Sequence, residues 1–169
     1  MTTYTELKQQ ILDYCETDAA VVTDVIINDI IAQAEAMIFQ RLPSLPCFRQ
    51  ITTANFVIGT FDYTVANARM IRQVSITDSS SNVSFLDHRI DSYLRDYHPN
   101  SSTTSTPEMY STKNATTSGI IFTVAPTPSA TLAYQVDFIA PVTGLSSSNT
   151  TTWLGDNAEN VLLAAALYE

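Results

Sequence analysis

The sequence predicts an α+β protein, in which a helical bundle made from both ends of the chain carries an inserted antiparallel β-sandwich-like module. Two observations predict this arrangement. Apolar residues recur at helical spacing at both ends of the chain, whereas the long Ser/Thr-rich segment between them largely alternates as strands do. We therefore expect a helical domain of residues 1–45 and 153–169, and a β module of residues 46–152 with one short helix near 87–97.

The size and composition of the chain are those of a globular protein that needs no disulfide or metal to fold. A chain of 169 residues is expected to bury roughly 70% of its unfolded surface. Cys15 and Cys47 lack CxxC spacing, so two reduced thiols are expected. The start of the chain lacks a signal peptide, and the apolar stretches fall short of the ~20 residues of a membrane helix. We expect a soluble protein made in the cytosol, without membrane contact.

The charge of the chain argues against specific nucleic-acid binding. The net charge is −9 and the sequence pI is about 4.4. The eight Lys and Arg residues are scattered, whereas tight phosphate binding needs clustered cations. A surface past which DNA slides remains compatible with this charge, because repulsion prevents adhesion.

Two amphipathic helices are expected at the N-terminal end. The first begins with a capping box formed by Thr3 and Glu6, and it should end near residues 16–18. The second takes Thr23 as its N-cap and ends before Pro43, because proline cannot continue a helix. Glu35 falls outside the apolar stripe of this second helix.

A third helix is expected over residues 157–169, with Asp156 or Asn157 as its N-cap. Its apolar face must be buried, and the nearest unmatched apolar stripe belongs to the N-terminal pair. The following residues are assigned to this bundle: Leu7, Ile11, Ile27, Ile31, Ile38, Trp153, Leu162, Leu163 and Leu167.

Strands are expected where the hydrophobic period is two. Residues 70–76 alternate cleanly. Residues 119–124 and 131–139 are separated by so few residues that an antiparallel hairpin is predicted. Between these segments, Asp87 is expected to cap a short helix that runs through Tyr97.

The chain shows no credible catalytic site. The HExxH, P-loop, GxSxG and GxGxxG motifs are missing from the sequence. His88 and His98 flank the expected short helix, but Asp87, His88 and Asp91 within one short segment match no standard zinc pattern. We expect a surface or interface role for these histidines, and neither enzymatic activity nor a metal or other cofactor.

Several segments stand in a definite order along the chain. They are YTELKQQILDYCETD, DIIAQAEAMIFQRL, MIRQVSI leading to DHRIDSYLRDY, Pro107-Glu108-Met109-Tyr110-Ser111, GIIFTVAPTP, LAYQVDFIAPVTGLS, and Trp153-Leu154 leading to ENVLLAAALYE. Their order and spacing resemble those of the head-to-tail adaptor (connector) proteins of short-tailed bacteriophages, the class that includes the tail tubular protein A type. The resemblance covers essentially the whole chain.

The resemblance implies a structural virion protein that is assembled in the host cytoplasm and placed at the head-tail junction. Twelve copies would form a homo-oligomeric ring below the portal protein, which extends the DNA channel for ejection without sequence-specific binding. The ring would also be the platform for tail nozzle and fibre proteins. Family members usually continue well past the position of Glu169, with more helix and a C-terminal tail that engages the portal.

The resemblance also implies roles for particular residues. The bundle residues named above would form the ring interface as well. Ser101, Thr104, Pro107 and Tyr110 would lie in loops that face tail partners.

Two other interpretations remain open. One is another phage tail or decoration protein, which would have the same Ser/Thr-rich β surface without needing a bundle. The other is a small hydrolase or a carbohydrate-binding β-sandwich, for which Trp153, the tyrosines and the β core are the supporting features.

Overall fold

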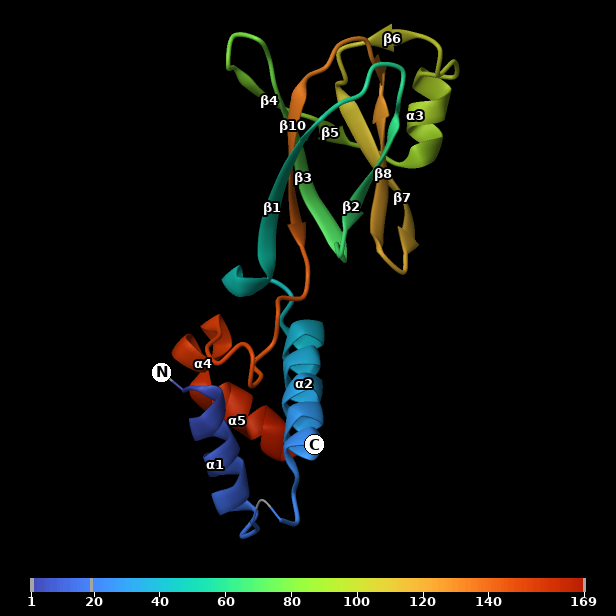
Figure 1. Cartoon of the computed structure of the whole chain (residues 1–169). Coiled ribbons are helices and arrows are strands. Elements are labelled where there is room, and N and C mark those ends of the chain that lie inside the picture. The colour runs from blue at the N-terminus through green and yellow to red at the C-terminus, as the bar shows by residue number, and fades with distance from the viewer. Residues whose placement is uncertain (1, 19, 169) are drawn as a thin grey trace. The chain divides into compact units, whose positions relative to one another are not determined.

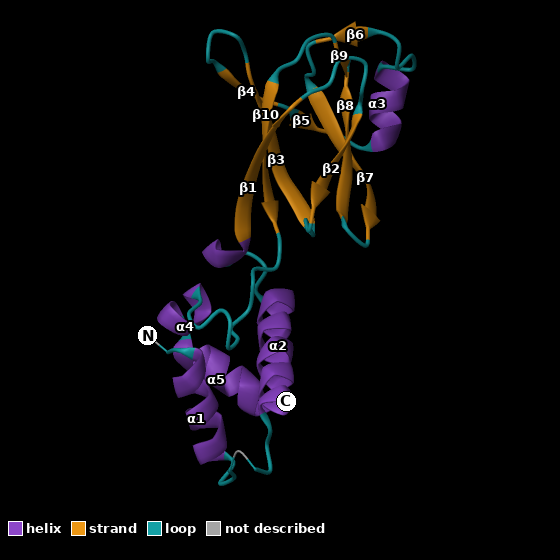
Figure 2. Cartoon of the chain, viewed as in Figure 1, coloured by secondary structure: helices purple, strands orange, loops and turns teal. Residues whose placement is uncertain are grey.

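The structure is a computed structural model that describes residues 2–18 and 20–168, and it confirms the α+β class. The chain divides into two compact units (Figures 1 and 2). The helical unit consists of residues 1–48 and 141–169, and the β unit consists of residues 49–140. The second boundary thus falls earlier than the expected one, which was placed at residue 153.

The helical unit is built from helices of both chain ends. They are α1 (Tyr4–Tyr14), α2 (Asp24–Arg41), the 3₁₀ turn Pro46–Phe48, α4 (Trp153–Asn157) and α5 (Glu159–Tyr168). Helix α5 packs against both α2 and α1. The capping box is confirmed, because the Glu6 N–H donates to Thr3 Oγ1 at 3.3 Å and the Thr3 N–H donates to Glu6 Oε2 at 2.8 Å. Thr23 is the N-cap of α2, but its side chain makes no cap hydrogen bond.

The cap expected for the last helix is wrong. Asp156 and Asn157 lie inside α4, whose N-cap Thr152 accepts the Gly155 N–H through Oγ1 at 3.2 Å. A separate helix α5 then follows. The Thr152 side chain supplies an oxygen acceptor, as the expected caps would, but it caps the short helix α4 that precedes α5. Glu169, the last residue of the expected helix, lies outside the described residues.

Glu35 of α2 holds the segment that leads into α4. Its carboxylate accepts the Leu145 N–H, with the two oxygens at 3.0 and 3.2 Å from the nitrogen. A Cβ atom at Gly144 would lie 2.0 Å from Glu35 Oε2, so the glycine leaves room for the carboxylate. Burial raises the pKa of Glu35, and the Leu145 hydrogen bond opposes this effect only in part.

The β unit contains ten strands and one helix among the described residues. They are β1 (Arg49–Asn55), β2 (Asp62–Ala66), β3 (Met70–Thr77), β4 (Val83–Phe85), β5 (Asp87–His88), α3 (Asp91–Tyr97), β6 (Thr104–Ser105), β7 (Met109–Thr116), β8 (Gly119–Ala125), β9 (Thr127–Pro128) and β10 (Ala133–Ile139). Two four-stranded sheets have the orders β1-β10-β3-β4 and β2-β8-β7-β5, and β6 pairs with β9. The short β5–β7 and β6–β9 pairs are parallel, and the others are antiparallel.

One hydrophobic core joins the two sheets of the β unit. Its aromatic centre is formed by Phe56, Tyr63, Phe122 and Tyr134, whose rings lie 4.5 to 5.8 Å apart between neighbouring centroids. The Tyr63 hydroxyl donates to the Thr60 carbonyl at 2.7 Å, so the polar end of this ring is satisfied. The core therefore draws residues from both sheets.

The chain enters the β unit on β1 and leaves it on β10, and these two strands pair. The antiparallel register runs from Arg49 opposite Ile139 to Asn55 opposite Ala133. Arg49 also forms an ion pair with Asp137, with Nε donating to Oδ1 at 3.0 Å. The Asp137 side chain is buried, so the pair fixes β1 and β10 together at the strand ends where the chain enters and leaves the unit.

The predicted hairpin of residues 119–124 and 131–139 is wrong. Strand β8 pairs with β2 and β7, whereas β10 lies between β1 and β3 in the other sheet. Pro126 and Pro128 lie between them. Because prolines have no N–H to continue a ladder, the chain crosses between the sheets here instead of turning back.

The expected cap of the short helix is also wrong, because α3 begins only after its N-cap Ile90. The backbone before it pairs with β7 instead. The Asp87 N–H donates to the Glu108 carbonyl at 2.9 Å, and the Arg89 N–H donates to the Tyr110 carbonyl at 2.8 Å. These hydrogen bonds hold the segment extended.

Gly119→Ala is predicted to destabilise the β unit strongly. Gly119 has a φ of +152°, and an added Cβ would lie 2.0 Å from the backbone oxygen of Val65. We expect a loss of about 2–4 kcal/mol in the free energy of unfolding, measured with urea. Gly59→Ala is the control, since Gly59 has a φ of +78° with nothing within 4 Å, and about 1 kcal/mol is expected. Equal losses would contradict the close approach to Val65.

Glu35→Gln is predicted to change how stability depends on pH. Burial raises the folded pKa of Glu35 above 4.5, so the folded state binds more protons than the unfolded state between the two pKa values. The stability due to Glu35 therefore falls as pH rises through this window. The glutamine keeps an oxygen for the Leu145 N–H and removes the charge, so the stability of the wild type relative to the variant should fall as pH rises from the unfolded pKa through the raised folded pKa.

Glu6→Gln supplies the opposite control for this measurement. Hydrogen bonds from Thr3 lower the pKa of Glu6, so its contribution is present above the unfolded pKa and is lost as pH falls. Urea unfolding of both variants across pH should therefore give slopes of opposite sign. Slopes of the same sign would refute the assignment of Glu35 as a buried, desolvated carboxylate.

Candidate functional site

The residues expected at the bundle and ring interface fall into two groups. Six of them are buried inside the helical unit: Leu7, Ile11, Ile27, Ile31, Ile38 and Leu162. Trp153 and Leu167 are exposed, and Leu163 is half-buried. The first group holds the helical unit together, and only the second group presents apolar surface to another molecule.

The residues expected in partner-facing loops also divide. Ser101 and Thr104 are exposed, and Thr104 lies in β6. Pro107 is buried, and Tyr110 lies in β7 with only 2% of its surface exposed. The Tyr110 side chain belongs to the core that joins the two sheets. It is therefore not part of an exposed loop.

The most developed polar site lies beside α3 in the β unit. Helix α3 is fixed there by Leu94, which is buried together with Met109 and Ala125. One turn of helix brings Asp91 and Arg95 together, and the Arg95 Nε donates to Asp91 Oδ2 at 2.7 Å. Arg95 is also placed in the last turn, where a cation is favoured by the helix dipole.

The facing side of the site comes from three neighbouring strands. The register of β7 with β8 shifts between Thr112 and Asn114, so Lys113 is the extra residue of a β-bulge. Bulges redirect side chains, and the Lys113 Nζ donates to Asp62 Oδ2 on β2 at 3.1 Å. Thr123, which pairs with Asp62 across β2 and β8, donates its hydroxyl to Asp62 Oδ1. Both oxygens of Asp62 are thus occupied.

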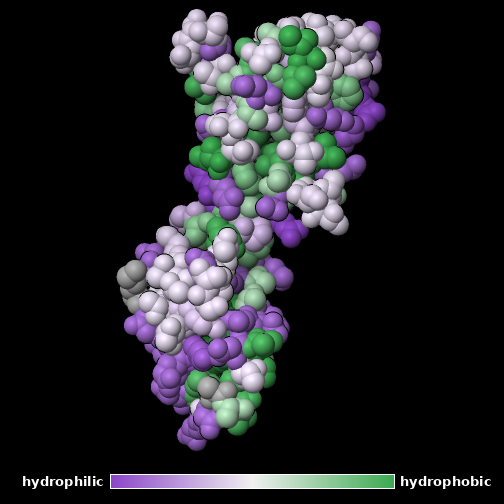
Figure 3. Space-filling model, in the orientation of Figure 1, coloured by the Kyte–Doolittle hydropathy of each residue, from purple (hydrophilic) through white to green (hydrophobic). Residues whose placement is uncertain are grey.

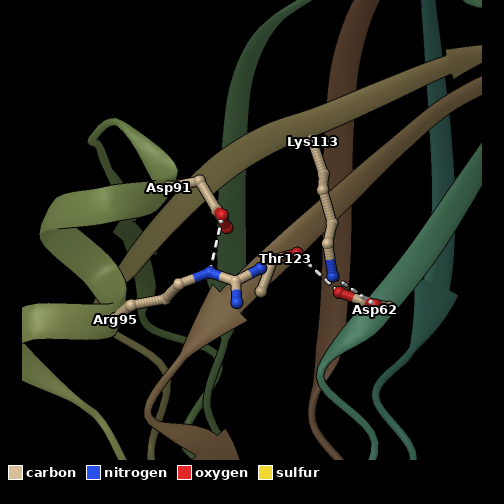
Figure 4. Close-up of polar contacts among 5 residues, drawn as sticks. All are labelled: Asp62, Asp91, Arg95, Lys113 and Thr123. Atoms are coloured by element: carbon tan, nitrogen blue, oxygen red, sulfur yellow. Dashed lines mark hydrogen bonds and ion pairs between the residues drawn. The ribbon is translucent and has the colours of Figure 1, made fainter.

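These groups surround a cavity of about 260 Å³. Figure 4 shows Arg95 and Lys113 extending from two sides toward Thr123. The cavity is lined by Phe61, Asp91, Leu94, Arg95, His98, Pro99, Asn100, Ser101, Lys113, Thr123, Val124, Ala125 and Thr127. The Thr127 hydroxyl donates to the Ser101 carbonyl at 2.7 Å, which ties the loop after α3 to β9.

The cavity offers several hydrogen-bond donors from its two cations. Arg95 uses Nε for Asp91, which leaves the N–H groups of both Nη atoms, and the Lys113 ammonium has further protons beyond the one given to Asp62. The His98 Nε2 is buried and has no hydrogen-bond partner within residues 2–18 and 20–168. The site can thus bind an acceptor, and its carboxylates act by holding the cations in place.

Among the described residues, no three His, Cys, Asp or Glu side chains are grouped so that they could hold a metal ion. Within the same residues, no helix has the length and apolar character that crossing a membrane requires.

Few features of the sequence indicate this cavity. Asp91 and Arg95 have the spacing of a helical ion pair, and His98 follows the expected short helix. The pairing of Asp62 with Thr123 and the bulge at Lys113 depend on strand register, which no local pattern reports. No family model matches the chain, and no curated protein matches it significantly either.

Asp62→Asn is predicted to weaken the β unit. The change removes the ion pair to Lys113 and turns an amide N–H₂ toward the ammonium, while an oxygen remains for Thr123. Because Asp62 and Lys113 are partly exposed, we expect a loss of only about 1 kcal/mol in urea unfolding. Asp96→Asn on the exposed side of α3 makes the same charge change and should have little effect. If both variants lost equal stability, the carboxylate of Asp62 would not be a structural anchor.

Proposed function

We propose that the chain is a structural virion protein, a head-to-tail adaptor that forms a ring below the portal protein. In this proposal the helical unit is the ring-forming and portal-facing bundle. The β unit is the inserted β-sandwich-like module that offers a platform to tail nozzle and fibre proteins. The order of the sequence segments supports the proposal, and so does the surface of the helical unit.

The observation that carries the proposal is an exposed apolar surface on the helical unit. Val25 of α2 is 68% exposed and Tyr168 of α5 is 77% exposed. Figure 3 shows hydrophobic surface at the end of the helical unit where α1 runs into α2. The other large apolar side chains of this unit that are exposed are Tyr14, Val21, Ile26, Leu42, Val142, Trp153, Val161 and Leu167. The hydrophobic surface at the end where α1 runs into α2 is typical of an interaction site.

The proposed ring contact therefore differs from the buried bundle core. Residues such as Ile27 and Ile31 pack inside each copy, whereas their exposed neighbours on α2, Val25 and Ile26, would contact the next copy. Figure 1 draws the end of α5 next to the beginning of α2, the helix against which it packs. Exposed apolar residues of both helices can then contribute to one surface.

The charge and the loops of the chain fit the same function. A net charge of −9 lets DNA pass through a channel without adhering to its wall. Ser101 and Thr104 are exposed on the β unit, where tail proteins would bind. In this proposal DNA passes through the channel without sequence-specific binding.

Light scattering coupled to size-exclusion chromatography tests the proposal. Without the portal protein, we expect the purified chain to have a molar mass below that of a ring. When the portal protein of the same virion is added, we expect the chain to form a ring. No ring in the presence of the portal would refute the proposal. A stable ring without the portal would keep the adaptor function and remove the dependence on docking.

Val25→Asp is predicted to impair ring assembly, because it places a charge in the apolar contact. We expect the apparent assembly affinity to fall about tenfold or more, with urea unfolding of the single chain little changed. Val57→Asp is the matched control, because Val57 is an exposed valine of the β unit. Equal impairment by both variants would show that the contact is not confined to the helical unit.

A further inference from the structure

We propose that the cavity beside α3 is a binding site for a small organic acid, whose carboxylate is held between Arg95 and Lys113. The inference depends on the β unit alone. It does not require the ring proposed above.

Arg95 and Lys113 both have hydrogen-bond donors left for a ligand in the cavity. Asp91 binds Arg95 at Nε, so the two Nη atoms form the free end of the guanidinium. Parallel N–H groups of this kind bind both oxygens of a carboxylate. Lys113 lies on the other side of Thr123 (Figure 4), held by Asp62. A carboxylate between the two cations would receive donors from opposite walls.

Each of the two cations is held by a carboxylate before any ligand arrives, Arg95 by Asp91 and Lys113 by Asp62. The Lys113 ammonium is fixed by Asp62, which is itself fixed by the Thr123 hydroxyl. It also lies 5.9 Å from the centroid of the Phe61 ring. Side chains already held in position lose less conformational entropy when a ligand binds. The buried Nε2 of His98 adds a further polar atom at the same cavity.

The net charge of the site limits the charge of the ligand that it can bind. The charges of Arg95, Lys113, Asp62 and Asp91 cancel, so the site can balance little negative charge. A carboxylate brings one negative charge, whereas inorganic phosphate brings roughly 1.5 at neutral pH, close to the carboxylates of Asp62 and Asp91. The site therefore favours a monocarboxylate.

Part of the cavity lining is apolar. Phe61, Leu94, Val124 and Ala125 contribute apolar surface beside the donors. Inorganic anions would leave this surface without a partner, whereas the hydrocarbon part of an organic acid would cover it. A volume of about 260 Å³ suits a small free molecule rather than a peptide segment.

The test uses the full-length chain and benzoate as the probe. Benzoate should bind in calorimetry at millimolar concentration or below, and it should shift the backbone amide signals of Lys113 and Thr123 in NMR spectra. Benzamide has the same shape without the charge and should bind at least about tenfold more weakly. Inorganic phosphate should also bind more weakly than benzoate.

Two variants locate the site. Arg95→Gln and Lys113→Met should each lower the affinity for benzoate about tenfold or more. Arg89→Gln makes the same charge change at an arginine that pairs with Asp87 and does not line the cavity. The affinity of this variant for benzoate should therefore equal that of the wild type. NMR spectra of each variant without benzoate establish that the fold is intact.

Several outcomes would overturn the inference. They are equal binding of benzoate and benzamide, equal weakening by Arg89→Gln, phosphate binding as tightly as benzoate, or no binding in the millimolar range. A short peptide that bound more tightly than benzoate, and only with a free C-terminal carboxylate, would assign the cavity to a chain terminus instead of a free acid.

Discussion

The pairing of β1 with β10 is the interaction on which the rest of the structure depends. The chain enters the β unit at Arg49 and leaves it after Ile139, and these residues are partners in one antiparallel ladder. The Arg49–Asp137 ion pair fixes this register at the end where the chain enters and leaves. Because the points at which the chain enters and leaves the β unit then lie side by side, the two ends of the chain can belong to one helical unit. Without this pairing, the β unit would separate α2 from α5.

Local features were predictable from the sequence, whereas features set by strand partners were not. The capping box of Thr3 and Glu6 needs only a spacing of three residues, and the structure contains it. The strand of residues 119–124 was also expected, but its partners were wrong because a periodic pattern does not name the neighbouring strand. Glu35 stood outside an apolar stripe, and its role depends on Leu145, far along the chain.

The candidate site illustrates the same limit. Arg95 and Asp91 lie one helical turn apart, so their pairing follows from the sequence once a helix is assumed. Lys113 reaches Asp62 only because a bulge redirects it and because β8 lies between β7 and β2. Tyr110 shows the converse error. A loop was expected around it, but the antiparallel pairing of β7 with β8 and its short parallel pairing with β5 make this segment part of a sheet.

The division of the chain also determines the order in which its parts can fold during synthesis. Every residue of the β unit has been made once residue 140 is added, whereas the helical unit lacks its second segment, which begins at residue 141. During that interval the apolar face of α2 around Ile31, which the finished helical unit buries, has no α5 to cover it. A nascent chain exposes such a surface to chaperones and to other nascent chains. The helical unit is therefore the last part to close, although it contains the first residues to be made.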